Sequence, residues 1–354
     1  MFLRSHLSIG QAALDHQVRV LNYDQIYAYG LDANITPAIQ LLNDLPEDIS
    51  TKDAAFKKKF LDRFQGEKSQ AVEQDIEHEG IRELVQIFQT YWRQSMLDTS
   101  QNFDGHLARQ ILPFLKKNYP ASRNTEIQRD SIGYFLSRYI RSQGFYTTEE
   151  IGKTGRLIDL PIWQVQIDTL YSFQLHKEEM NVSVKMMKDF ISLGWLEFAT
   201  LGRHYPGGWA KKDGLYCVVK AYDLESENFK VSYLAHEGRH FNDYQLFPNL
   251  VSADLEYRAK LTELSLAEES LYDLLEFFSK NGNANSKNPH QLANYHVIEN
   301  LKGELFKKGQ EPDSHLWKTR SVKKIHRKAL RLLKRNTKEL SEHGKDVKSL
   351  LRPT

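Results

Sequence analysis

The sequence has very little cysteine: Cys217 is the only one among 354 residues. A lone cysteine excludes an internal disulfide and any metal cage built from several cysteine sulfurs. It favours a reducing compartment such as the cytoplasm, although a cysteine-poor secreted protein would look the same. The compartment therefore stays open, with a slight preference for the cytoplasm.

Long apolar runs and a strong charge imbalance are also missing. No segment approaches the roughly 20 apolar residues that span a bilayer, and residues 1–6 lack the apolar core of a secretory signal. The net charge is only +2, so no field over the whole chain attracts nucleic acid. We expect a soluble protein that has no transmembrane segment and no nucleic acid among its partners.

Helical periodicity dominates the first part of the chain. Apolar residues recur at helical spacing over 69–98, and shorter amphipathic segments lie near 51–65, 103–118 and 128–143. We interpret residues 1–145 as an N-terminal helical domain, for which the sequence indicates no purpose.

The pattern changes after residue 145. Alternating apolar residues over 160–167 predict a strand, and the β-branched and aromatic run 215–222 predicts another. Residues 182–201 carry apolar side chains that favour a buried helix.

Two helices are then expected in succession. The first covers about 228–246 and is ended by Pro248, since proline cannot continue a helix. The second begins near Ser252, a suitable N-cap residue, and runs to about Lys280. The chain as a whole therefore predicts an α+β fold that is mostly helical, with a small sheet.

The first of these two helices carries His236, Glu237 and His240 in the pattern H-E-x-x-H. Histidines four positions apart project from one face of a helix and can meet one ion. Neutral imidazole is a good ligand for Zn²⁺, and a catalytic zinc needs three protein ligands and one open position. Glu237 lies beside the first histidine, where a carboxylate can act as general base and then general acid.

The second helix supplies candidates for the third ligand. Glu256 and Glu263 are seven positions apart, so they share one helical face. We take Glu256 as the ligand and Glu263 as the alternative ligand or as a group that orients a ligand histidine through a hydrogen bond. Asp243, three positions after His240, competes for that orienting role.

A similar beginning occurs once more, at His78 and Glu79, but Arg82 stands where the second histidine is needed. We interpret this segment as an exposed helix surface. The complete motif at His236 is the more specific signal, because its helical context and the acidic helix after it agree with a metal site.

The four positions His236, Glu237, His240 and Glu256 resemble the gluzincin class of zinc metallopeptidases. In that class a glutamate on the next helix completes H-E-x-x-H, and residues 256–259 are similar to its E-x-x-A element. The resemblance implies a zincin-like catalytic domain over 146–300, a Zn²⁺ cofactor and a peptide or protein substrate. It also implies a helix and then an edge strand before the motif. Residues 182–201 resemble that helix, and residues 215–222 resemble that strand.

The sequence departs from the familiar E-x-x-A-D version of this pattern, because Lys260 replaces the aspartate. It also lacks the third histidine and the methionine turn of metzincins. The resemblance covers roughly residues 180–280, and no particular subfamily is implied.

Hydrolysis also needs a hydrogen-bond donor for the developing oxyanion. Tyr295 and His296 are the downstream candidates for this role, and His204 and Tyr205 are the upstream ones. The last two, together with Trp209 after two glycines, are also candidates for a lip over the cleft. For each of these residues taken singly, a local hydrogen bond, or for Trp209 a simple turn, is at least an equal explanation.

The C-terminal segment, residues 301–354, is expected to be a basic helical tail. Residues 318–338 contain ten lysines and arginines and no acidic residue, around an apolar stripe that includes Ile325 and Leu332. A weak contact with an anionic surface is one interpretation, but a helix docked through its apolar stripe is favoured. A non-catalytic interaction protein with a structural or vestigial zinc site is the alternative function.

Overall fold

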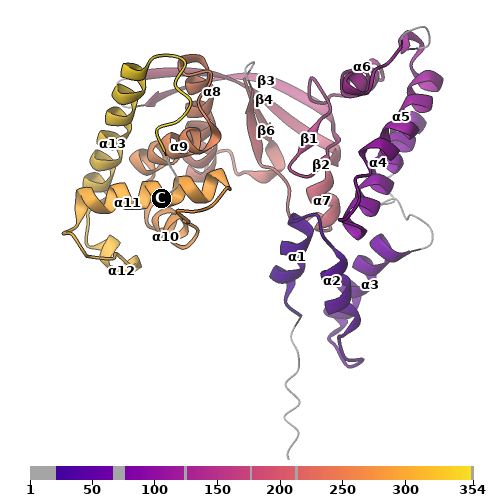
Figure 1. Cartoon of the computed structure of the whole chain (residues 1–354), viewed down its shortest axis with the longest axis horizontal. Coiled ribbons are helices and arrows are strands. Elements are labelled where there is room, and N and C mark those ends of the chain that lie inside the picture. Colours follow the sequence, from indigo (N-terminus) through magenta and orange to yellow (C-terminus); the bar gives the residue numbers. More distant parts are fainter. Residues whose placement is uncertain (1–20, 67–75, 123–125, 176–177, 212–213, 352–354) are drawn as a thin grey trace, which may run out of the picture. The chain divides into compact units, whose positions relative to one another are not determined.

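The computed structural model describes residues 21–66, 76–122, 126–175, 178–211 and 214–351 (Figure 1). The chain divides into two compact units, one formed by residues 1–143, 147–161 and 191–205, the other by residues 144–146, 162–190 and 206–354. The coarse class is confirmed, since the fold is α+β and mostly helical with a small sheet. Among the described helices, none is both long and apolar enough to cross a membrane.

The first unit is helical apart from a short pair of strands. Its longer helices are α1 (Tyr23–Leu31), α2 (Thr36–Asn43), α3 (Thr51–Gln65), α4 (Glu79–Leu97), α5 (Asp104–Asn118) and α6 (Ile132–Ser142). The shorter elements are η1 (Pro120–Ser122), η2 (Arg129–Ser131), β1 (Lys153–Thr154), β2 (Leu157–Ile158) and α7 (Trp195–Ala199). The four helical segments predicted for this part of the chain are therefore present.

Aromatic side chains hold these helices together. Phe60 and Phe64 of α3, Phe198 of α7 and Trp92 of α4 form a continuous series whose neighbouring ring centroids lie 4.9–5.6 Å apart. All four side chains are buried. Aromatic pairs at such distances add about 0.5–1.5 kcal/mol each beyond their buried area, so this series forms the core of the first unit.

Helix α4 begins ten residues later than predicted, and residues 69–75 of the predicted helix lie outside the described residues. Its N-cap is His78, whose Nδ1 accepts a hydrogen bond from the N–H of Ile81. The segment interpreted as exposed helix surface is thus a helix start. A histidine nitrogen satisfies one of the free N–H groups there.

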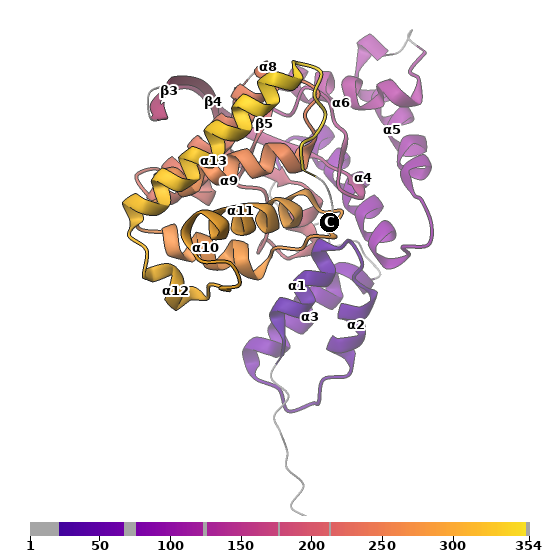
Figure 2. The same ribbon diagram turned by 60° about the vertical axis from the view of Figure 1, so that its left-hand side comes forward.

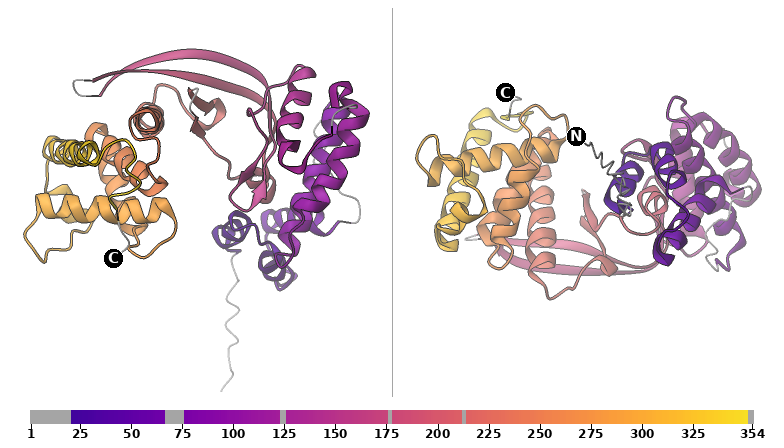
Figure 3. Two further views of the ribbon diagram at one scale, coloured as in Figure 1. Left: turned by 45° about the horizontal axis from the view of Figure 1, so that its top comes forward. Right: turned by 90° about the horizontal axis from the view of Figure 1, so that it is seen from below.

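The second unit contains a four-stranded sheet of order β3–β4–β6–β5. Its strands are β3 (Pro161–Leu175), β4 (Glu178–Leu193), β5 (Gly208–Lys211) and β6 (Gly214–Val218). Strands β3 and β4 are long and curved (Figure 3). Strand β6 pairs parallel with β4 and antiparallel with β5.

The helix predicted over 182–201 is wrong: the segment forms all but the first four residues of β4, followed by the short helix α7. Val182, Val184 and Met186 are buried at every second position and face the core of the sheet. This period of two is the strand signature. The alternation was obscured because Met187, directly after Met186, is buried as well.

The strand predicted over 215–222 is shorter than expected, because β6 ends at Val218 and the 3₁₀ turn η3 (Val219–Ala221) follows. It is also an inner strand, with all five side chains buried. The edge strand before the motif is β5 instead. The expectation of an edge strand at 215–222 is therefore wrong in its position.

The helices of the second unit follow the sheet. They are α8 (His236–Leu246), α9 (Ser252–Leu266), α10 (Leu271–Lys280), α11 (Pro289–Leu305), α12 (Ser314–Lys318) and α13 (Val322–His343). A π-helical segment, η4 (Asn228–Ala235), runs directly into α8. The helix predicted over 228–246 is therefore confirmed, but its first eight residues are coiled as a π-helix.

Helix α9 is the centre of this unit and packs against α8, α11 and α13 (Figures 1 and 2). Every residue from Asp254 to Ser265 is buried. On its apolar side, Leu261 and Leu264 join a core with Ile325 and Leu332 of α13. The basic C-terminal helix is thus docked through its apolar stripe, and residues 301–354 belong to the second unit.

The single helix predicted from Ser252 to Lys280 is interrupted between α9 and α10. The carboxylate of Glu227 accepts hydrogen bonds from the N–H groups of Glu268, Glu269 and Ser270 and from the Ser270 hydroxyl, at 2.6–3.1 Å. An anion at a helix start satisfies N–H groups that otherwise lack partners. A side chain distant in sequence therefore ends one helix and begins the next.

Candidate metal centre

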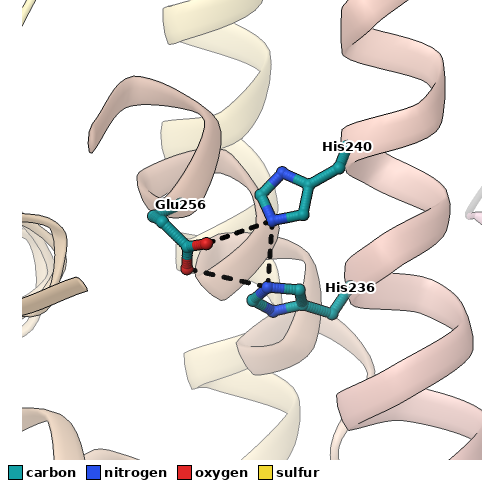
Figure 4. Close-up of side chains that lie close together, drawn as sticks. All are labelled: His236, His240 and Glu256. Carbon is teal, nitrogen blue, oxygen red and sulfur yellow. Dashed lines mark hydrogen bonds and ion pairs between the residues drawn. The ribbon is translucent and has the colours of Figure 1, made fainter. Parts of the chain in front are cut away.

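Helix α8 places His236 and His240 on one face, one turn apart. Their Nε2 atoms lie 3.1 Å from each other, and both rings are buried. The neighbouring helix α9 directs Glu256 at the same point (Figure 4). Its Oε1 lies 3.3 Å from Nε2 of His240, and its Oε2 lies 3.6 Å from Nε2 of His236.

These three residues are the ones that the structure brings together as a potential metal site, with ligand atoms all within 4.8 Å of one another. Tetrahedral zinc with ligand distances near 2.0–2.1 Å requires ligand atoms about 3.3 Å apart. The observed separations of 3.1, 3.3 and 3.6 Å lie around that value. Two imidazole nitrogens and a carboxylate are also a donor set that suits Zn²⁺.

The hydrogen bonding and the ionisation of Glu256 agree with binding of a cation. Oε2 of Glu256 is buried and makes no well-aligned hydrogen bond with a described residue, although Nδ1 of His290 lies 2.9 Å and Nζ of Lys260 lies 3.5 Å from it. Burial alone raises the pKa of the Glu256 carboxyl, but contacts from His240 and His290 and the charge of His236 hold that pKa well below its usual range. The carboxyl is therefore ionised at neutral pH, which is the form that binds a metal.

Glu263 holds His236 from the other side. Its Oε1 is hydrogen-bonded to Nδ1 of His236, and both side chains are buried. Burial lowers the pKa of His236, but the carboxylates of Glu263, Glu237 and Glu256 outweigh it, so the pKa is raised. An Nδ1–H bound to a carboxylate fixes the tautomer that leaves Nε2 free for a metal. This contact fits the orienting role considered for Glu263.

Asp243 does not orient a ligand histidine. Both of its oxygens accept hydrogen bonds from the guanidinium of Arg258, at 2.7 and 2.9 Å. Nδ1 of His240, the atom that Asp243 would have to reach, is buried and has no hydrogen-bond partner among the described residues. The contribution of Asp243 is thus an ion pair between α8 and α9.

Glu237 lies next to the cluster and is only partly buried. Its charge acts on His236 and on the tyrosines Tyr222, Tyr233 and Tyr244, whose pKa values are raised first by burial and then by nearby charges. Its carboxylate makes no hydrogen bond or ion pair with another described residue. The position suits a group that has to exchange protons.

His290, which the sequence analysis missed, contacts the cluster from the first turn of α11. Its Nδ1 lies 2.9 Å from Oε2 of Glu256, while its side chain remains 63% exposed. The N-cap residue Asn288 fixes this turn by accepting a hydrogen bond from the N–H of His290. No spacing rule joins His290 to Glu256, and its only sequence signal is the Asn-Pro-His start of a helix.

Lys260, which replaces the expected aspartate, also contacts the third ligand. Its Nζ lies 3.5 Å from Oε2 of Glu256 and 4.8 Å from the ring centroid of Phe278. The carboxylate that contacts a motif histidine comes instead from Glu263, three positions later.

The other predicted site residues are not part of the His-His-Glu group. Tyr295 and His296, on α11, contact each other with ring centroids 5.3 Å apart, and neither belongs to the His-His-Glu group. Trp209 lies on the edge strand β5 and stacks on Tyr216 at 5.4 Å, so it is part of the sheet and not of a loop. His204 and Tyr205 belong to the first unit, where the His204 ring contacts Tyr27.

Comparison of the chain with protein-family models, with curated proteins and with solved structures found no match. The chemistry of the site therefore has to be inferred from the side chains themselves.

Proposed function

We propose that the chain is a zinc-dependent hydrolase, and that it cleaves peptide bonds as a metallopeptidase of the gluzincin type. The observation that carries the proposal is the convergence of His236, His240 and Glu256 at separations suited to zinc, with Glu237 beside them. The buried carboxylate of Glu256 and the hydrogen bond between Glu263 and Nδ1 of His236 support it further. The second unit would then be a zincin-like catalytic domain.

Each residue has a defined part in this chemistry. Zinc held by His236, His240 and Glu256 would polarise the scissile carbonyl and make water more acidic. Glu237 takes a proton from the attacking water as the bond to the carbonyl carbon forms. It gives that proton to the amine nitrogen as the carbon–nitrogen bond breaks, so water is consumed and no other reactant is needed. Glu263 keeps the ring of His236 in the required tautomer.

The donor for the developing oxyanion stays a prediction. Tyr295 and His296 remain the candidates within the second unit, and His290 joins them because it contacts the third ligand and is open to solvent. Peptide as the substrate class follows from the resemblance to gluzincins, whereas the side chains themselves specify metal-assisted hydrolysis.

The proposal is tested with the purified full chain by elemental analysis and by cleavage of a fluorogenic peptide library. We expect about one zinc per chain, and a Glu237→Gln variant that keeps its zinc and loses about 10²–10⁴-fold in rate. The matched control is Glu79→Gln, since Glu79 also follows a histidine at the start of a motif-like segment but is exposed.

Two outcomes would separate the alternatives. A wild-type chain without zinc, even after reloading, would overturn the metal site. Zinc at full occupancy with no cleavage of any library peptide would favour the non-catalytic interaction protein with a structural ion.

A further inference from the structure

The first unit contains a cavity of about 310 Å³ that the proposed function does not use. It lies between α4, α5, α6 and the strands β1 and β2, entirely within that unit. Its volume is at the lower end of the range of about 300–1,000 Å³ found for small-molecule sites.

The floor of the cavity is apolar. Phe88 of α4, Leu107 and Ile111 of α5, Leu136 of α6 and Ile158 of β2 line it. The backbone of Gly152 lies at its wall, and a Cβ placed there would meet no atom within 4 Å. The apolar part of the lining therefore suits an apolar side chain.

Two of the charged groups on the rim neutralise each other. Nζ of Lys153 lies 2.6 Å from Oδ2 of Asp104, and the hydroxyl of Tyr91 donates a hydrogen bond to Oδ1 of Asp104 at 2.8 Å. The polar atoms of Lys153, Asp104 and Tyr91 are therefore already paired with one another and offer little to a ligand.

Three further charged side chains line the cavity and lack such partners. Arg129, in η2, and the carboxylates of Asp130 and Glu150 form no side-chain hydrogen bond or ion pair with another described residue. Nη2 of Arg129 is placed over α5, 2.8 Å from where a Cβ on Gly105 would lie. The lining thus combines apolar side chains with one cation and two anions that have no side-chain partner among the described residues.

We propose that this cavity binds a free α-amino acid with a large apolar side chain. Arg129 would pair with the carboxylate, because a guanidinium binds carboxylates through two parallel hydrogen bonds. Asp130 or Glu150 would pair with the ammonium group, and the side chain would occupy the floor. Only a zwitterion uses the unpaired groups of both signs, whereas a fatty acid or an alkylamine leaves one sign unused.

This inference does not depend on the metal centre, which lies in the other unit. It assigns to the helical part of the chain the binding of a small molecule of the kind that peptide hydrolysis releases. Binding and hydrolysis can therefore be tested separately on the same protein.

Isothermal titration of the full chain with leucine, phenylalanine, glycine and glutamate provides the test. We expect the two apolar amino acids to bind, and each to bind at least about tenfold more tightly than glycine or glutamate. Leucinamide and N-acetylleucine, which lack one charge each, should also bind at least about tenfold more weakly than leucine.

Two variants localise the site. Arg129→Gln should weaken leucine binding about tenfold or more, while the matched variant Arg109→Gln, on the exposed side of α5 and outside the cavity lining, should leave it unchanged. Gly152→Leu should block binding by filling the space at the wall. Because Arg129 is exposed and Gly152 has open space, both variants should fold, which circular dichroism checks.

Other results would overturn the inference. These are the absence of leucine binding, binding of decanoate or decylamine with no binding of leucine, and leucine binding that survives both variants.

Discussion

Two buried polar clusters lie between α8 and α9, and they differ in how well their groups are satisfied. The first, the Arg258 cluster, consists of Arg258, Asp243, Asn336 and Thr337, with hydrogen bonds of 2.7–3.0 Å from the guanidinium to all three partners. The second is the metal cluster of His236, His240 and Glu256. The same pair of helices thus carries two groups of charges in the same surroundings.

Charge balance separates the two clusters. In the Arg258 cluster the buried anion Asp243 meets the buried cation Arg258, with both side chains 0% exposed, and a second buried cation, Arg239, lies 3.7 Å from the same carboxylate. Around the metal cluster, the carboxylates of Glu237, Glu256 and Glu263 all act on His236, and Lys260 forms an ion pair with Glu256. Nδ1 of His240 is also buried and has no hydrogen-bond partner among the described residues. Since buried charges are normally paired, the Arg258 cluster is satisfied by protein groups, whereas the excess of carboxylates at the metal cluster agrees with the cation that we propose there.

Removing the third ligand should have the largest effect. Glu256→Ala leaves only two histidines for the ion, so we expect zinc content to fall from about one per chain to near zero and peptide cleavage to disappear. Glu269→Ala, an exposed carboxylate just beyond α9, is the control. Elemental analysis measures the outcome, and full zinc retention in Glu256→Ala would remove Glu256 from the site.

Breaking the Arg258 cluster should lower the stability of the fold without changing the zinc content. Arg258→Met removes the closer cation from the buried Asp243 and leaves it with the longer contact to Arg239, at 3.7 Å, so we expect a loss of up to about 3–5 kcal/mol in the free energy of unfolding. The double variant Arg258→Met with Asp243→Leu should recover much of that loss. Urea unfolding gives the free energies, and loss of zinc from a still folded Arg258→Met variant would contradict the separation of the two clusters.

Asp159, in the first unit, shows what happens to a buried carboxylate without a cation. Its Oδ1 accepts hydrogen bonds from the N–H groups of Leu160 and Trp195, but burial dominates and raises its pKa from 3.8 to about 6. The protonated form is favoured by folding, so this contribution to stability is present below about pH 4 and is lost as the pH rises through 6.

The variant Asp159→Asn keeps the acceptor oxygen and removes the charge. At pH 7.5 we expect it to be more stable than wild type by about 2–3 kcal/mol, as two pKa units imply, and at pH 4 to be equal. The exposed Asp44→Asn is the control. Urea midpoints measured from pH 4 to pH 8 test this, and an equal gain at both ends would contradict the assigned pKa.

The contact behind His236 should have a smaller effect. Glu263→Gln keeps a hydrogen-bond acceptor but removes the charge that stabilises the ligand tautomer, so we expect zinc affinity to fall about 10–100-fold. Competition with a chromophoric chelator gives the affinity. Unchanged affinity would mean that Glu263 acts on folding alone, whereas loss of zinc stoichiometry would make it a ligand.

The sequence predicted the parts of the site that follow from helix periodicity. His236, Glu237 and His240 are joined by the spacing of one helix, and Glu256 is close enough in sequence to return on the next. Periodicity could not choose between Glu263 and Asp243, because the choice depends on where Arg258 lies. It also could not find His290, which reaches Glu256 from a third helix.

Some elements of the fold were predicted and others were not, because only some of them are determined by nearby residues. Segments whose character is local, such as α3, α5 and α6, were found. The break between α9 and α10 depends on Glu227, and β4 depends on pairing with β6 across the intervening α7 and β5. Such long-range partners leave no mark in a short window of sequence.

The smallest effect is expected for His290. It touches Oε2 of Glu256 from a largely exposed position, and exposed ion pairs contribute only about 0–1 kcal/mol. His290→Gln should therefore keep one zinc per chain, with an affinity within about fivefold of wild type, as should the control His315→Gln on the exposed side of α12. Loss of zinc from His290→Gln alone would show that a third histidine holds the ion, and the metal cluster would then have four protein ligands and the closed character of a structural site.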